Sequence, residues 1–83
     1  MKNKKLLEKI LSGSKNIKFQ DFINLVIAFG FNLDRINGSH HIYKKHGVEE
    51  LINLQNVNNE IKPYQIKQFL AIIEKYNLDL GDE

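Results

Sequence analysis

The chain has 83 residues, no cysteine and a formal net charge of +2. This length suits one domain, and the lack of cysteine excludes a disulfide framework, a thiol nucleophile and a cysteine-based zinc site. The charge is uneven, because residues 1–46 carry nine Lys/Arg and three Asp/Glu, whereas residues 47–83 carry three and seven. Such asymmetry indicates a basic face suited to phosphate groups, with ordinary surface lysines as the alternative.

The N-terminal segment predicts an amphipathic helix over residues 2–11, with lysines around an apolar stripe and Gly13 after its end. Glu8 and Lys9 interrupt the apolar run, so we do not expect a signal peptide. No apolar run is long enough to span a membrane. We therefore expect a cytoplasmic protein with no membrane association.

A second helix is predicted over residues 19–29, where five apolar residues repeat at helical spacing. Gly30 followed by apolar Phe31 is typical of a Schellman ending. A last helix is predicted to begin at Pro63, since proline fits the first helical position, and to carry its apolar stripe to Tyr76. An acidic segment, NLDLGDE, follows.

Between these helices the pattern changes to strands. Asn37-Gly38 separates FNLDRI from SHHIYKK and predicts a two-residue hairpin turn. A third strand is predicted over residues 49–55, after a turn at His46-Gly47. The order predicts an α+β fold in which helices cover one face of a three-stranded antiparallel sheet.

The predicted turn sets the register around two adjacent histidines. It pairs Ile36 with Ser39, Arg35 with His40, and Asp34 with His41. Neighbouring strand residues point to opposite faces, so His40 and His41 do not line one site, and a zinc site, which needs three or four converging ligands, is disfavoured. Alternation places His40 with Leu33 and Ile42, and His41 with Tyr43, unless a bulge swaps the faces.

One histidine on such a hairpin has a plausible chemistry. An imidazole exchanges a proton near neutral pH, Arg35, Lys44 and Lys45 supply positive charge, and Ser39 can orient the ring or the substrate. This set suits metal-free attack of an RNA 2′-hydroxyl on its own phosphate. The alternative from the residues alone is an exposed histidine pair on a basic strand.

The motif RINGSHHIY resembles the Arg-x-x-Gly-Ser-His-x-x-aromatic signature of the HicA (YcfA) toxins. EIKPYQIKQFL resembles the Lys-Pro segment that opens the last helix of that family, and FGF also fits. The resemblance covers roughly residues 19–78. It implies a double-stranded-RNA-binding-domain-like α-β-β-β-α fold and a metal-independent ribonuclease that cuts mRNA. It also implies a HicB-type antitoxin as partner.

The resemblance assigns catalysis to His40, with Gly38 and Ser39 carried over beside it. Arg35, Gly38, Lys44, Lys45 and Lys62 are the expected contacts to RNA phosphate, and no metal or other cofactor is expected. We expect His41 to pack or to lie on the surface. Tyr43 and Tyr64 are expected in the core rather than as platforms for stacked bases.

The chain departs from the family pattern in two places. The helix over residues 2–11 is additional, and it could pack on the helical side of the sheet, mediate self-association or add basic contacts. Glu49 and Glu50 are expected to place negative charge beside the RNA surface. We therefore divide the chain into an additional N-terminal helix (residues 1–14), a HicA-like domain (residues 15–78) and an acidic tail (residues 79–83).

Two other functions stay open from the sequence. One is a non-catalytic RNA-binding module of the same fold, which would read RNA by shape and backbone contacts. The other is a protein-interaction domain with no role in nucleic-acid binding. For the free protein we favour a monomer.

Overall fold

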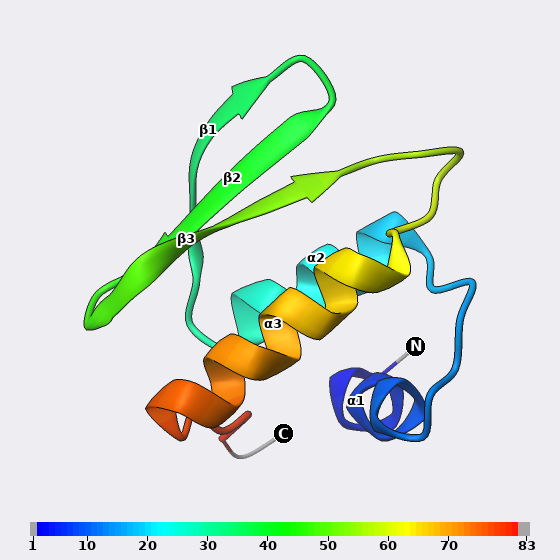
Figure 1. The fold of residues 1–83 in the computed structure, drawn as a ribbon, viewed down its shortest axis with the longest axis horizontal. Coiled ribbons are helices and arrows are strands. Elements are labelled where there is room, and N and C mark those ends of the chain that lie inside the picture. The colour runs from blue at the N-terminus through cyan, green and yellow to red at the C-terminus, as the bar shows by residue number, and fades with distance from the viewer. Residues whose placement is uncertain (1, 82–83) are drawn as a thin grey trace.

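The computed structural model describes residues 2–81; Met1, Asp82 and Glu83, which belong to the predicted terminal segments, lie outside the described residues. The elements in chain order are α1 (Asn3–Leu11), α2 (Phe19–Ala28), β1 (Asn32–Asn37), β2 (His40–Lys45), β3 (Val48–Gln55) and α3 (Pro63–Tyr76). Figure 1 shows the sheet on one side of the α2–α3 pair and α1 on the other side. After α1, the α-β-β-β-α order confirms the predicted double-stranded-RNA-binding-domain-like fold, and the other face of the sheet is left open.

Helix α2 ends as its sequence predicts. The N–H of Gly30 donates to the carbonyl of Ile27 (2.9 Å), and the N–H of Phe31 donates to that of Val26 (3.4 Å), which is the bonding of a Schellman motif. Gly30 has a φ of +96°, a conformation that glycine adopts without strain. This ending turns the chain directly into β1 and buries Phe31.

The three strands form an antiparallel sheet in the order β1-β2-β3, but the β1–β2 turn differs from the predicted one. Asn37 pairs with His40, so the two turn residues are Gly38 and Ser39 rather than Asn37 and Gly38. Within the turn only Gly38 has a positive φ, of 60°. This matches a type II′ turn, which needs glycine at its first central position, whereas a type I′ turn would need a positive φ at Asn37 too.

A bulge in β1 changes the register a second time. Leu33 pairs with Tyr43 and Arg35 pairs with Ile42, so Asp34 is the extra residue. The bulge moves Leu33 to the helix-facing side of the sheet, and the prediction that Leu33 shares a face with His40 is therefore wrong. Leu33 is nevertheless 47% exposed, since β1 is an edge strand.

The core lies between the sheet and the α2–α3 layer. Phe69 of α3 is completely buried at its centre, and its ring meets three other rings edge to face, those of Phe22, Phe29 and Phe31. The sheet contributes Tyr43, Ile52 and Leu54 from its helix-facing side. Burial of Tyr43 confirms its predicted place in the core and raises the pKa of its hydroxyl by desolvation.

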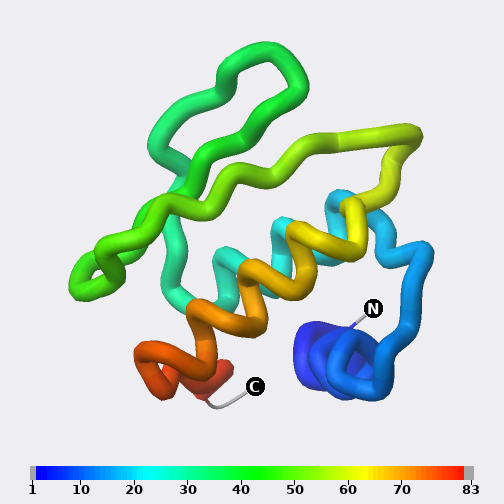
Figure 2. The backbone as a smooth tube through the Cα atoms, viewed as in Figure 1, coloured from blue at the N-terminus to red at the C-terminus, as the bar shows by residue number. Residues whose placement is uncertain are grey.

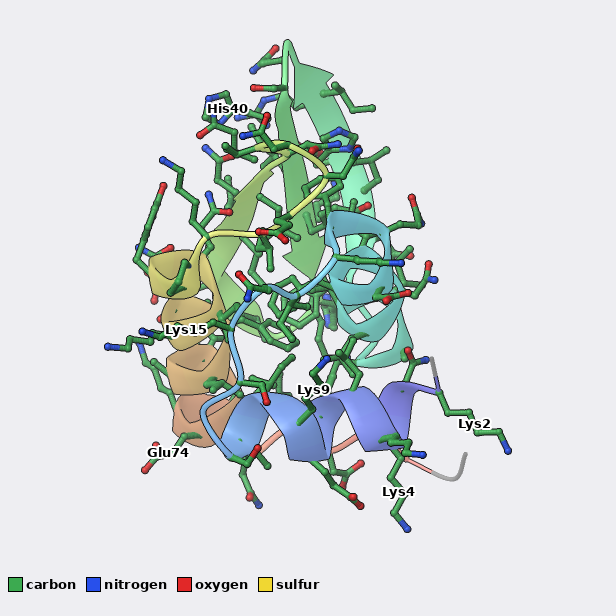
Figure 3. The ribbon with its side chains drawn as sticks, turned by 90° about the vertical axis from the view of Figure 1, so that its right-hand side faces the viewer. Lys2, Lys4, Lys9, Lys15, His40 and Glu74 are labelled. Atoms are coloured by element: carbon green, nitrogen blue, oxygen red, sulfur yellow. The ribbon has the colours of Figure 1, made fainter. Side chains whose placement is uncertain are left out.

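Helix α1 packs beneath the other two helices through buried Leu6 and Ile10. Packing on the helical side is thus the role that the structure shows for this additional helix. Lys2 and Lys4 point away from the sheet, at the opposite end of the molecule from His40 (Figure 3). The basic residues of the first half therefore do not form one face. Within residues 2–81 no helix has the length and apolar character needed to cross a membrane.

The segments that lead into α2 and α3 run beside each other (Figure 2). The N–H of Phe19 donates to the carbonyl of Asn59 (2.8 Å), and the N–H of Ile61 donates to that of Ile17 (3.0 Å). As predicted, α3 begins at Pro63. Both helices therefore start at the same side of the molecule, where their N–H groups and dipoles favour negative charge.

A polar clamp joins the far end of the sheet to the end of α3. The hydroxyl of Tyr76 donates to Oε1 of Glu50 (2.5 Å) and accepts the N–H of Glu49 (3.2 Å), while Nζ of Lys75 lies 2.8 Å from Oε2 of Glu50. The carboxylate of Glu50 thus faces α3, which corrects the prediction that it lies beside the RNA surface. Hydrogen bonds from Lys75 first and Tyr76 second lower the pKa of Glu50 to about 2.

We expect this clamp to stabilise the fold in a pH-dependent manner. Since the pKa of Glu50 is lower in the folded than in the unfolded chain, its contribution is present above about pH 4.5 and is lost as the pH falls toward about 2. Melting temperatures of the wild type and Glu50→Gln, measured across this range, should differ most at neutral pH and converge in acid. A difference independent of pH would show that ionised Glu50 does not stabilise the fold.

Candidate functional site

His40 is the first residue of β2 and lies on the open face of the sheet. Its neighbour His41 points the other way, where its ring meets that of Phe19 at 5.1 Å. The two histidines therefore lie on opposite faces, as strand alternation predicts. Among residues 2–81 no group of three or more His, Cys, Asp or Glu side chains is placed to hold a metal ion.

Residues with amide side chains flank His40 on both neighbouring strands. Asn37 is its partner across β1 and Gln55 its partner across β3, so both share its face. Nδ1 of His40 lies 3.0 Å from Oδ1 of Asn53, the diagonal neighbour on β3. His40 as a whole is only half-buried, although Ile42, two residues along the same face, is buried. Figure 3 shows His40 near the tip of the sheet, far from α1.

The structure brings Arg35 close to His40, but not directly opposite as predicted. Arg35 pairs with Ile42 and is therefore a diagonal neighbour of His40, at roughly 7–8 Å between Cα atoms. Its guanidinium binds the carboxylate of Asp34. The predicted pairing of Arg35 with His40 is wrong because the turn is displaced by one residue, which moves the partner of Arg35 two residues along β2 to Ile42.

Asp34 also engages one of the two predicted lysines. Nζ of Lys44 lies 3.2 Å from Oδ1 of Asp34, and hydrogen bonds from Lys44 first and Arg35 second lower the pKa of Asp34. Lys44 shares the face of His40, but it stands four residues along β2, roughly 13 Å away. One ionised carboxylate thus offsets part of the positive charge on this face.

Lys45 does not share this surface. Its side chain lies over Gly30, at the end of α2, on the helix-facing side of the sheet. The prediction that it accompanies Lys44 near His40 is therefore wrong. Neighbouring strand residues point to opposite faces, so the two lysines of the pair separate as the two histidines do.

A chain of hydrogen bonds connects the β1–β2 turn to the start of α3. Nε2 of Gln55 donates to Oγ of Ser39 (3.3 Å), and the backbone N–H of Gln55 donates to Oε1 of Gln65 (3.2 Å). Nε2 of Gln65 in turn donates to the hydroxyl of Tyr64 (3.3 Å). Gln65 lies in the first turn of α3, so Lys62, the N-cap residue, is at this end of the molecule too.

Tyr64 is 52% exposed, so the prediction that it belongs to the core is wrong. The helical stripe that buries Ile66 and Phe69 turns Tyr64 outward. The ring of Tyr64 is therefore exposed at this end of the molecule.

Asn53 and Gln55 were not among the predicted site residues, because they lie on β3, outside the Gly-Ser-His motif. A signal for Asn53 was present in the sequence. An unbroken ladder from a two-residue turn at His46-Gly47 would pair His40 with Asn53. The observed irregularity shifts this pairing by two residues, so Gln55 stands opposite His40 and Asn53 stays on the same face.

Comparison with known proteins identifies a family match. The sequence model of a family described as HicA toxin of bacterial toxin-antitoxin matches residues 19–74, which include the Gly38-Ser39-His40 motif. The match runs from the start of α2 into α3 and leaves α1 outside. No curated protein and no solved structure matches the chain.

Proposed function

The chain belongs to the HicA toxin family, and we propose that it is a metal-independent endoribonuclease that cleaves mRNA with His40. Toxins of this family are generally ribonucleases, and that coarser assignment is the premise. The observation that carries the proposal is the position of His40, half-buried on the sheet face opposite to α2 and α3, with one ring nitrogen hydrogen-bonded to Asn53.

The proposed reaction is a transfer of the phosphoryl group within the RNA strand. Nε2 of His40 accepts the proton of a 2′-hydroxyl, the 2′-oxygen bonds to the adjacent phosphorus, and the bond from phosphorus to the 5′-oxygen breaks. The leaving oxygen takes a proton from the imidazolium or from water. The products are a 2′,3′-cyclic phosphate and a 5′-hydroxyl, and proton transfer of this kind contributes roughly 10²–10⁴-fold to a rate.

Charge develops on the phosphate oxygens, and the turn beside His40 supplies donors for it. The hydroxyl of Ser39 accepts a hydrogen bond from Gln55 and so keeps its own proton to donate. Gly38, exposed in the turn, lets the RNA backbone approach closely. Arg35 supplies positive charge diagonally, and Lys44 and Lys62 contact phosphates farther along the strand.

Asp34 provides a test of these phosphate contacts. Asp34→Asn removes the carboxylate that neutralises Arg35 and Lys44, so we expect tighter RNA binding. The slope of log affinity against log salt should steepen by about one phosphate contact. The measurement is a salt titration of RNA affinity, carried out on a His40→Ala background so that the RNA stays intact. An unchanged slope would show that RNA does not reach this end of β1.

A HicB-type antitoxin is the proposed partner, as the family assignment supports. We expect it to cover the open face around His40, and coexpression should restore growth that the toxin alone arrests. An mRNA substrate implies that the toxin acts in the cytoplasm.

The deciding experiment measures RNA cleavage directly. Purified protein is incubated with RNA in excess EDTA, and the ends of the products are identified by mass spectrometry. We expect cleavage with 2′,3′-cyclic phosphate ends, together with growth arrest and mRNA decay on induced expression in a bacterial host. Binding of RNA without cleavage would instead support the non-catalytic module, and cleavage only in the absence of EDTA would overturn the metal-independent mechanism.

A further inference from the structure

The side chain of Asn53 stands behind the imidazole of His40, on the neighbouring strand. We propose that Asn53 is a positioning residue, which fixes the His40 ring with its proton on Nδ1 and its lone pair on Nε2, toward the substrate. The proposal rests on the proposed ribonuclease function and extends it to a residue outside the Gly-Ser-His motif.

The contact is a direct one between two adjoining strands. Nδ1 of His40 and Oδ1 of Asn53 are 3.0 Å apart, within hydrogen-bonding distance. Asn53 pairs with Ile42, which is 7% exposed, so the backbone that carries the amide is held by the β2–β3 ladder. Sites built on paired strands hold their geometry better than sites built on loops.

The chemistry of the amide determines where the proton resides. An amide oxygen only accepts hydrogen bonds, so a neutral imidazole must donate Nδ1–H to it. The lone pair is then on Nε2, and no hydrogen bond to Nε2 occurs among residues 2–81. A free imidazole side chain prefers the other tautomer, in which Nε2 carries the proton. In that tautomer Nε2 cannot accept another proton and cannot act as a base. The Asn53 amide therefore selects the form that can act as a base on RNA.

Gln55, the next residue on the same face of β3, also holds a side chain of the Gly-Ser-His motif. Gln55, two residues along, donates its amide N–H to Oγ of Ser39. One strand thus orients both side chains of the Ser39-His40 pair, through two amides at alternate positions. These two contacts support a positioning role for the amides of Asn53 and Gln55, beyond that of ordinary surface side chains.

The first measurement is the tautomer of His40, which does not depend on any activity. Long-range ¹⁵N–¹H correlation spectra at a pH where histidines are neutral should show Nδ1–H at His40 in the wild type. Asn53→Leu should shift the population toward Nε2–H, and Asn53→Asp, which keeps an accepting oxygen, should retain Nδ1–H. His46, exposed in the β2–β3 turn, gives an internal reference in the same spectra.

The second measurement is the kinetics of RNA cleavage. Asn53→Leu should lower kcat about 10- to 100-fold, the size of loss that follows when a metal-bound histidine loses its hydrogen-bond partner, with KM nearly unchanged. Asn53→Asp should recover much of kcat.

The outcomes separate the two proposals. If His40→Ala abolishes cleavage while Asn53→Leu keeps wild-type kcat, the ribonuclease stands and the role of Asn53 is overturned. A wild-type His40 with its proton on Nε2 would overturn it as well. If no variant cleaves RNA but the tautomer changes as expected, the ribonuclease function fails and Asn53 is a structural partner of His40 only.

Discussion

Phe69→Ala is expected to lower the melting temperature by about 15–30 °C and to leave a substantial fraction of the chain unfolded under mild conditions. Phe69 is completely buried, and its ring meets those of Phe22, Phe29 and Phe31 edge to face, at centroid distances of 5.3, 5.4 and 6.0 Å. Truncating such a side chain costs about 3–5 kcal/mol, through lost burial and the cavity that remains. Alanine returns at most about 0.7 kcal/mol as a better helix former, so the loss dominates.

The size of the domain makes this loss severe. A chain of 83 residues has a free energy of unfolding of roughly 4–12 kcal/mol, at 0.05–0.15 kcal/mol per residue. Thermal and urea unfolding followed by circular dichroism measure the change. Tyr64→Ala is the matched control, since it removes a half-exposed ring from the same helix and should shift the melting temperature by only a few degrees. Equal shifts for both variants would contradict the central role of Phe69.

The helical parts of the fold follow directly from the sequence. Apolar spacing in residues 19–29 and the Gly30-Phe31 pair determine α2 and its ending, and Pro63 determines the start of α3. Each of these sequence patterns spans only a few residues and favours a single local structure. Tyr64 was the exception: it was expected in the core as an aromatic residue, although the spacing of Ile66 and Phe69 turns it away from the buried stripe.

The hairpin register could not be derived with the same certainty. Asn37-Gly38 suits a type I′ turn and Gly38-Ser39 suits a type II′ turn, and the two overlap in one tripeptide. The structure has the second turn, together with a bulge at Asp34. A bulge depends on contacts between paired strands, so the sequence of β1 alone does not predict it.

The consequences for the candidate site are unequal. The face of His40 relative to His41 follows from alternation alone, so it was predictable from β2. The positions of Arg35 and Leu33 depended on the turn and the bulge, and both were misplaced. Asn53 depended on the second hairpin, whose irregularity shifts the pairing by two residues and so conserves the face. A shift by an even number of residues changes the pairs but keeps each side chain on its face of the sheet, whereas an odd shift moves it to the other face.

His40→Ala is expected to lower the rate of RNA cleavage by about 10²–10⁴-fold, which is the usual contribution of a positioned acid or base. The remaining activity would come from Ser39, Gly38 and the cations, which stabilise charge on the phosphate without moving a proton. RNA affinity should change little, since a single imidazole ring supplies few of the phosphate contacts. The measurements are initial rates of cleavage in EDTA and RNA affinity by fluorescence anisotropy.

The control is His46→Ala, which removes the same kind of side chain from an exposed turn at the other end of β2. It should leave both the rate and the affinity at wild-type values. Truncation of His40 should also spare the fold, because its ring is half-exposed and its partner Asn53 can turn to water. A folded His40→Ala variant that cleaves RNA at the wild-type rate would exclude His40 as the group that moves the proton.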